Sequence, residues 1–189
     1  MASIDVNQIS KGMKLEINED PYEIIGYQHV KPGKGQAFAR IKLKNLKTGN
    51  VVEKTYKVGE KLEVADFEER EMEYLYNDGT FFYFMDTKTY EQIGISTENI
   101  GEKANFLKEN KSIQVQFYKG EPISVKLPKT VILQIIETEP GFKGDTVNNV
   151  FKPATVETGA IVQVPTFINE KEYVKIDTET GKYLERVNK

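Results

Sequence analysis

Apolar and polar residues alternate in short runs along most of the chain. The run 37–44 is representative, because its odd positions are apolar while its even positions are aromatic or basic. Since successive side chains of a strand point to opposite faces, this run predicts a strand with one apolar face and one basic face. Other runs that predict strands are 51–56, 71–76, 81–85, 113–117, 123–127, 162–164, 173–176 and 183–184. The chain is therefore predicted to be all-β, with many short strands.

Turn-forming sequences separate several of these runs and predict β-hairpins. The Asp78-Gly79 pair is the strongest example, because glycine tolerates the positive φ that a tight hairpin turn requires. Comparable turns are expected at 47–50, 119–120 and 179–181.

One segment departs from the strand pattern. Its apolar positions recur at helical spacing, at Ile100, Ala104 and Leu107. A helix is therefore predicted over 98–109, with Thr97 as its N-cap and Asn110 at its end. A helix between two pairs of strands fits a small barrel of the oligonucleotide/oligosaccharide-binding (OB) type, where its apolar face is expected to plug the barrel rather than bind a partner.

The balance of acidic and basic residues changes twice along the chain, and these changes predict three domains. Residues 1–65 carry 11 bases and 8 acids, residues 66–127 carry 7 and 12, and residues 128–189 carry 8 and 9. Short polar joints lie at both boundaries. The turn sequence at 86–90 is repeated in part at 177–180, which favours related second and third domains.

Composition excludes several classes of function. The 189 residues include no cysteine and one histidine, His29, so disulfides, thiolate nucleophiles and cysteine-based zinc sites are excluded. No G-x-S-x-G elbow or nucleotide-binding fingerprint is present, and Lys34 lacks the Ser/Thr of a phosphate-binding loop. We expect no catalytic residue, no metal and no cofactor, although paired carboxylates stay open. No apolar run approaches the roughly 18 residues of a membrane span, which predicts a cytoplasmic protein.

Basic residues concentrate in one part of the first segment. Residues 31–57 contain eight bases and one acid, a local charge of +7 in a chain whose net charge is −3. Such a patch can replace counterions on a phosphate backbone, which favours binding to RNA over a merely solvated lysine face. The residues that we assign to tRNA or ribosomal RNA backbone on this basis are Arg40, Lys42, Lys44 and Lys54.

The sequence K-P-G-K-G-Q-A-F at 31–38 predicts a narrow hairpin tip within this patch. Pro32 and Gly33 suit a tight turn, and Gly35 frees the backbone before the next strand begins. Lys34 would then stand alone at the tip. Glycine-rich tips with a lysine are common, however, and most have no function.

Several motifs resemble the bacterial elongation factor P family. They are the 31–38 segment, V-E-K-T-Y at 52–56, Y-L-Y-N-D-G at 74–79, P-G-F-K-G-D-T at 140–146 and K-P-A-T at 152–155. These matches span the chain in the family's order. Where the family has a turn glycine, this chain has Lys171, and we expect Asn169 to adopt the left-handed conformation in its place.

The resemblance implies three small β-barrels in an L-shaped arrangement. An SH3-like (KOW-type) N-terminal barrel would be followed by two OB-fold barrels, with one short helix in the second. It also implies a monomeric translation elongation factor that binds both ribosomal subunits and peptidyl-tRNA and relieves stalling at consecutive prolines. Such a factor is not an enzyme and acts in the cytoplasm, away from membranes.

The resemblance assigns roles to individual residues. Lys34 matches the loop-tip lysine that a modifying enzyme extends, and it would reach the CCA end of the tRNA. Lys31, Pro32, Gly33 and Gly35 would shape the loop and contact the CCA end. Gly144, Asp145 and Thr146 match a loop that approaches the messenger codon in the exit site. The sequence does not identify the chemical group on Lys34.

Two other classes of function stay open from the residues alone. A general OB/KOW-type RNA-binding protein or RNA chaperone would stack bases on aromatic side chains, such as those at 74, 76 and 81–84. Such a dense run is more typical of a hydrophobic core. A structural or protein-interaction module is the third class, in which Lys34 would be incidental.

Overall fold

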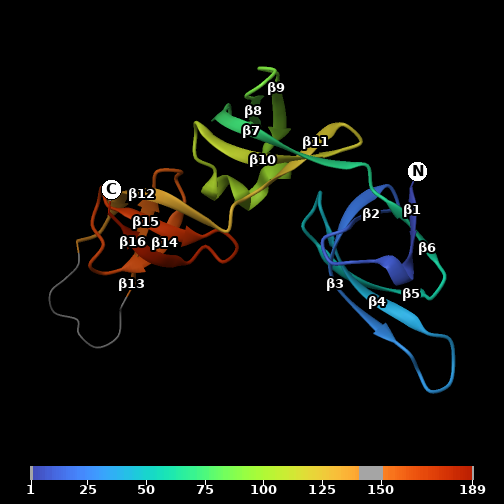
Figure 1. The fold of residues 1–189 in the computed structure, drawn as a ribbon. Coiled ribbons are helices and arrows are strands. Elements are labelled where there is room, and N and C mark those ends of the chain that lie inside the picture. Colours follow the sequence, from blue (N-terminus) through green and yellow to red (C-terminus); the bar gives the residue numbers. More distant parts are fainter. Residues whose placement is uncertain (1, 141–150, 189) are drawn as a thin grey trace. The chain divides into compact units, whose positions relative to one another are not determined.

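The computed structural model describes residues 2–140 and 151–188. Strands dominate the described residues and form three antiparallel sheets (Figure 1). By their contacts, the residues group into two compact units, Met1–Arg70 with Val115–Ser124 and Glu71–Gln114 with Val125–Lys189. The prediction of an all-β chain is confirmed. The domain boundaries after residues 65 and 127 stay a prediction.

The first sheet has six strands in the order β1-β6-β2-β3-β4-β5. Their bounds are β1 Ser3–Asp5, β2 Lys14–Ile17, β3 Asp20–Val30, β4 Phe38–Asn45, β5 Val51–Lys57 and β6 Lys61–Val64, with a 3-10 turn, η1, at Val6–Gln8. The alternation predicted for 37–44 is confirmed, since Ala39, Ile41 and Leu43 are fully buried in the core of this sheet. The even positions of β4 from residue 40 to 44 are exposed.

The second sheet has five strands in the order β11-β10-β7-β8-β9. Their bounds are β7 Phe67–Asn77, β8 Phe81–Asp86, β9 Gln92–Ser96, β10 Lys111–Tyr118 and β11 Glu121–Lys126. The predicted hairpins at Asp78-Gly79 and Lys119-Gly120 are present, with Gly79 at φ 95° and Gly120 at φ 80°. Tyr74, Phe82 and Phe84 lie in the interior.

The predicted helix over 98–109 is wrong in length and in its cap. The α-helix α1 covers only Thr97–Ile100, and a 3-10 helix, η2, follows at Gly101–Phe106. Ser96 is the N-cap, and its side chain accepts a hydrogen bond from the Asn99 N–H. Gly101 adopts φ 55°, which ends the α-helical conformation and accounts for the difference. Ile100 and Leu107 are nevertheless buried, as their spacing predicted.

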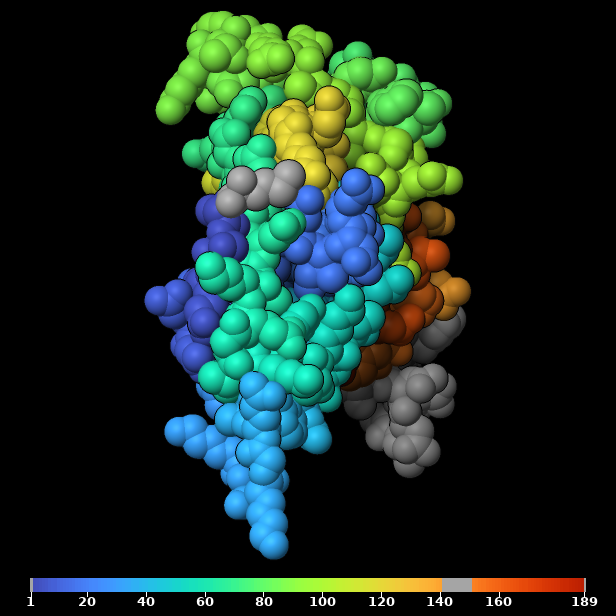
Figure 2. All heavy atoms as spheres, turned by 90° about the vertical axis from the view of Figure 1, so that its right-hand side faces the viewer, coloured from blue at the N-terminus to red at the C-terminus, as the bar shows by residue number. Residues whose placement is uncertain are grey.

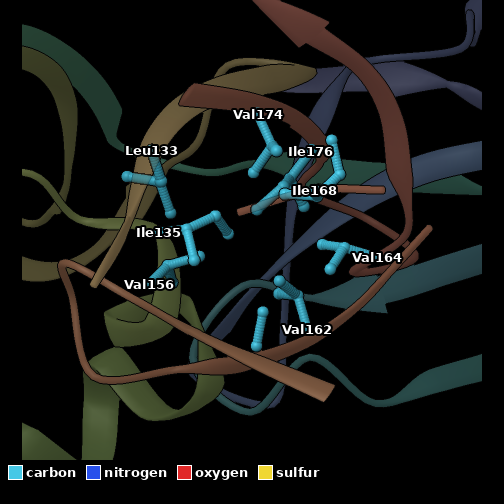
Figure 3. Close-up of a cluster of buried hydrophobic side chains, with 9 residues drawn as sticks. Leu133, Ile135, Val156, Val162, Val164, Ile168, Val174 and Ile176 are labelled. Atoms are coloured by element: carbon cyan, nitrogen blue, oxygen red, sulfur yellow. The ribbon is translucent and has the colours of Figure 1, made fainter. Parts of the chain in front are cut away.

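The third sheet has five strands in the order β14-β13-β12-β15-β16. Their bounds are β12 Thr130–Thr138, β13 Phe151–Val156, β14 Ile161–Pro165, β15 Tyr173–Asp177 and β16 Tyr183–Val187. Its core is aliphatic, and Figure 3 shows side chains of β12, β13, β14, β15 and the 166–172 connection pointing toward one another. The buried members are Leu133, Ile135, Ala154, Val156, Val162, Val164, Ile168, Val174 and Ile176.

One turn recurs in all three sheets. Its first residue accepts two backbone hydrogen bonds on a side-chain oxygen, from the N–H groups two and three residues later, with distances of 2.7 to 3.1 Å. These first residues are Asn45, Asp86 and Asp177. The fifth residue has positive φ in each copy: Gly49 at 78°, Tyr90 at 61° and Gly181 at 68°. The repeat found at 86–90 and 177–180 is therefore structural, and it extends to the first sheet.

Residues 115–124, the end of the β10–β11 hairpin, belong to the same compact unit as the first sheet. Tyr118 is 5% exposed and packs in a cluster with Leu46, Ala65 and Ile123. Its hydroxyl donates to the Glu19 carbonyl at 3.2 Å. Beside it, Lys119 forms an ion pair with Glu16 at 2.9 Å. The hydrogen bond from Lys119, a second one from Tyr118 and the positive charge of Lys119 lower the pKa of the Glu16 carboxyl.

Lys171 adopts the left-handed conformation itself, at φ 68°. The expectation that Asn169 would take this conformation is wrong. The Lys171 N–H donates to the Ile135 carbonyl at 2.8 Å, which holds the connection in place although lysine has a Cβ that disfavours positive φ.

Candidate nucleic-acid interface

The long hairpin of β3 and β4 positions the predicted loop. The two strands pair from Tyr22 opposite Asn45 to Val30 opposite Phe38, so residues 31–37 form the connection. Figures 1 and 2 show this hairpin projecting from the rest of the first sheet. Residues 31–36 are all exposed, and Lys34 lies near the middle of the connection. The structure therefore places its ammonium group in solvent.

Gly35 explains how the chain turns back from this tip. Its φ of 114° lies in a region that side chains with a Cβ rarely adopt. A Cβ on Gly35 would also lie 3.7 Å from Pro32 Cγ, which is ordinary contact. Backbone conformation, rather than space, is thus the reason for glycine at this position.

The outer face of β4 carries the cations that the alternation predicted. Arg40, Lys42 and Lys44 are exposed and point away from the buried side chains of the same strand. The Arg40 guanidinium lies 5.7 Å from the centroid of the Phe38 ring. Gly26 faces Lys42 across the β3–β4 ladder and leaves that side of Lys42 open, whereas the exposed Glu53 lies opposite Lys42 in the β4–β5 ladder.

Lys54 does not join these cations. It lies opposite Ile41 in the β4–β5 ladder, and residues opposite each other point to the same face of a sheet. Ile41 is fully buried, so Lys54 lies on the inner face and is half-buried. Lys57, opposite Phe38 and exposed, shares the basic face instead. The alternation along β5 carries the same signal, because Lys57 lies four residues after the exposed Glu53 and shares its face, whereas Lys54 is adjacent to Glu53 and points to the other face.

Lys47 also does not contribute a free cation to the basic patch, because its side chain contacts other residues. Its Nζ lies 2.7 Å from Asp20 Oδ1 and 5.3 Å from the centroid of the Tyr118 ring. The hydrogen bond from Lys47 is the main cause of the lowered pKa of the Asp20 carboxyl. Lys47 therefore helps to attach the β10–β11 hairpin rather than offering a free cation.

The aromatic run of the second sheet is divided between two faces. Phe82 and Phe84 are 4% and 0% exposed and belong to the interior, whereas Tyr76 and Phe81 are 48% and 40% exposed. The interpretation of the whole run as core is therefore only partly right.

Gly144, Asp145 and Thr146, the predicted codon loop, lie outside the described residues. Within residues 2–140 and 151–188, no three His, Asp or Glu side chains gather where they could hold a metal ion. None of the helices in that part of the chain is long and apolar enough to cross a membrane.

Three family models match successive parts of the chain. They are described as the elongation factor P (EF-P) KOW-like domain at residues 5–62, the elongation factor P (EF-P) OB domain at 67–125, and the elongation factor P C-terminal domain at 131–186. The KOW-like and OB types agree with the fold expected from the sequence, while the L-shaped arrangement stays a prediction.

Similar solved structures support the same fold. The chain is similar to the eukaryotic translation initiation factor 5A from Methanococcus jannaschii, with a TM-score of 0.56 and 24% identity over 66% of this chain and 92% of that one. A protein of the same family from Naegleria fowleri has a TM-score of 0.54 and 16% identity, covering 67% of this chain and 96% of that one.

Curated relatives match at higher identity over nearly the full length. Elongation factor P of Persephonella marina is 54% identical over 185 residues, which cover 98% of this chain and 97% of the relative. Elongation factor P of Sulfurihydrogenibium sp. is 52% identical over 186 residues, which cover 98% of each. With three successive family models matched and identities above half, this chain belongs to the elongation factor P family of translation factors.

Proposed function

We propose that the chain binds the ribosome beside peptidyl-tRNA and stimulates peptide-bond formation when consecutive prolines stall translation. Membership in the elongation factor P family supports a role in translation elongation. The single observation that carries the finer proposal is the exposed Lys34 at the end of a projecting hairpin. The ribosome performs the peptide transfer, and the factor contributes position rather than chemistry.

The geometry of the hairpin suits this role. Ala39 is the fully buried residue of β4 nearest the tip, and Lys34 lies five positions before it in the chain. At about 3.3 Å per extended residue, the tip can reach roughly 15 Å beyond the buried core. A slender projection of this length can enter a crowded RNA site that a barrel cannot.

A cation at the tip would act on the entropy of the reaction. Proline is conformationally restricted, so a stalled peptidyl-tRNA spends little time in reactive geometry. Lys34 would contact the CCA end and hold it in place, which lowers the cost of orienting the reactants. A covalent extension of Lys34 by a modifying enzyme would lengthen the arm and add hydrogen-bond donors. Lys31, Pro32, Gly33 and Gly35 would set the shape of the loop.

The basic outer face of the hairpin would bind RNA backbone behind the tip. Arg40, Lys42 and Lys44 lie on one face with Lys57, and together they can neutralise several phosphates. Lys54 is not included in this set, because it lies on the inner face. Contacts of Gly144, Asp145 and Thr146 with the codon in the exit site remain part of the proposal, as do binding as a monomer and action in the cytoplasm.

A reconstituted translation system tests the proposal. The readout is the rate of synthesis of a reporter with three consecutive prolines, compared with a reporter that lacks them. Natively produced protein should relieve the stall, Lys34→Ala should lose most of the relief, and Lys88→Ala, a change at an exposed turn of the second sheet, should retain it. Intact-mass measurement of the natively produced protein reports whether Lys34 is modified. Full relief by Lys34→Ala would refute the mechanism, and RNA binding without any relief would favour a general RNA-binding protein.

A further inference from the structure

The outer face of strands β7, β8 and β9 carries a cluster of partly exposed aromatic rings. Tyr76 lies opposite Tyr83 in the β7–β8 ladder, and their rings stack at 4.8 Å between centroids with 29° between planes. Phe81 lies beside them, 6.4 Å from the Tyr83 ring. Tyr76 is 48% and Phe81 40% exposed. We name Tyr76, Phe81 and Tyr83 the aromatic face.

Asp78 holds part of the aromatic face in place, and Gly94 keeps its rings accessible. The Tyr83 hydroxyl donates to Asp78 Oδ2 at 2.9 Å, and Asp78 Oδ1 in turn accepts from the Phe81 N–H at 2.8 Å. Opposite Tyr83 lies Gly94, where a Cβ would come within 3.5 Å of both Phe81 and Tyr83. A longer side chain at this position would cover the rings. The Tyr83 ring is thus held in place before any partner arrives, and Tyr76 stacks on it, which lowers the entropic cost of binding.

On the strands that carry it, the aromatic face has acidic rather than basic neighbours; the nearest exposed bases outside these strands are Lys88, in the turn between β8 and β9, and Lys111, at the start of β10. Strands β8 and β9 contain no lysine or arginine. The only base in β7 is Arg70, whose guanidinium pairs with Glu68 and lies 4.4 Å from the centroid of the Phe117 ring. Glu71 and Glu73 alternate with buried residues of β7 and therefore point to the same side as the aromatic face.

We propose that the aromatic face binds a basic, arginine-containing segment of a partner protein. Guanidinium groups stack on tyrosine and phenylalanine rings and also pair with carboxylates, so one segment can use both features of the surface. Single-stranded RNA could stack bases on the same rings, but its phosphates would meet Glu71 and Glu73 with no cation on β8 or β9 to offset them. The charge of this surface therefore favours a basic peptide over a nucleic acid. This inference does not depend on the function proposed above.

The location of binding is tested by NMR titration of the isotope-labelled full chain. The probes are a peptide of alternating arginine and glycine, the same peptide with lysine for arginine, and an oligouridylate. The arginine peptide should shift the amide signals of residues 76, 81, 83 and 94, and it should bind more tightly than the lysine peptide. The oligouridylate should shift residues 40, 42 and 44 instead. Peptide-induced shifts spread over all acidic surfaces, or equal shifts of the aromatic face by oligouridylate, would overturn the proposal.

Substitutions test the energetic role of the rings. The double variant Tyr76→Ala, Phe81→Ala removes two partly exposed rings and should weaken binding of the arginine peptide roughly tenfold. Gly94→Leu should weaken it as well by covering the rings without removing them. Phe151→Ala, which removes a 51% exposed ring from the third sheet, is the matched control and should leave affinity unchanged. Thermal unfolding verifies that each variant is folded. Equal affinity of a folded double variant and the unsubstituted chain would disprove the role of the aromatic face.

Discussion

Replacement of Tyr90 by glycine should stabilise the second sheet. Tyr90 occupies the fifth position of the recurring turn at φ 61°, where the copies in the other sheets have Gly49 and Gly181. A left-handed conformation costs an ordinary L-residue about 1–2 kcal/mol, and glycine avoids this cost. Because Tyr90 is 71% exposed, removing its side chain gives up little buried apolar area.

The unfolded chain opposes part of this gain. Glycine loses more backbone entropy on folding than other residues, which costs about 0.5–1 kcal/mol. The expected net effect of Tyr90→Gly is a gain of about 0.5–1 kcal/mol. The same reasoning predicts a loss of about the same size for Gly49→Ala, since a Cβ at Gly49 meets no atom within 4 Å and only the backbone effect remains.

Urea titrations followed by NMR measure both effects locally. Signals from β8 and β9 report on Tyr90→Gly, and signals from β4 and β5 report on Gly49→Ala. Separate probes are needed because a chain of several domains need not unfold in one step. The argument that backbone conformation controls these turns would be refuted by two results together. They are an unchanged or lower free energy of unfolding for folded Tyr90→Gly, and an unchanged free energy of unfolding for Gly49→Ala.

Three further changes test other parts of the structure. Lys171→Gly should raise the melting temperature of the third sheet, because lysine at φ 68° is strained in the same way as Tyr90. Ile168→Ala should cost about 2–5 kcal/mol in urea unfolding, since Ile168 is fully buried in the aliphatic core. Hydrogen bonds from the Thr180 backbone and side chain lower the pKa of Asp177, whose ordinary value is 3.8. The stabilisation by its charge is therefore complete above pH 4 or so and is lost as the pH falls through the lowered pKa. Asp177→Asn should keep the turn, as Asn45 does, but lose less stability than the unsubstituted chain between pH 7 and pH 3, measured by urea unfolding.

Strand alternation could be read from the sequence where strands are regular. The buried Ala39, Ile41 and Leu43 follow directly from the period of two. In β3 the period breaks, because the ladder shifts between Ile24 and Gly26, and this strand was not predicted. A bulge places an extra residue in one strand, so a period-based prediction loses the correct face beyond it.

Pairing between strands and other long-range contacts determine which of the predicted cations belong to the candidate site, and these contacts could not be predicted from the sequence. The exposure of Lys34 followed from local turn chemistry, which adjacent residues determine. The inner position of Lys54 depends on its register against Ile41, and the engagement of Lys47 depends on Asp20 and on Tyr118, 71 positions later in the chain. A count of local charge treats all these lysines alike, because it contains no information on long-range contacts.

The distribution of charge would give the two candidate surfaces different partners. Both surfaces have aromatic rings beside charged groups: Phe38 lies under Arg40 on the basic hairpin, and Tyr76 and Phe81 lie on the acidic sheet face. Aromatic stacking alone would therefore allow either surface to bind bases or guanidinium groups. Phosphates favour the basic hairpin and oppose the acidic face, so RNA would be directed to the hairpin and a basic protein segment to the sheet. A chain that was basic throughout would bind RNA in many orientations, whereas this separation of charge would restrict RNA to the surface from which Lys34 projects.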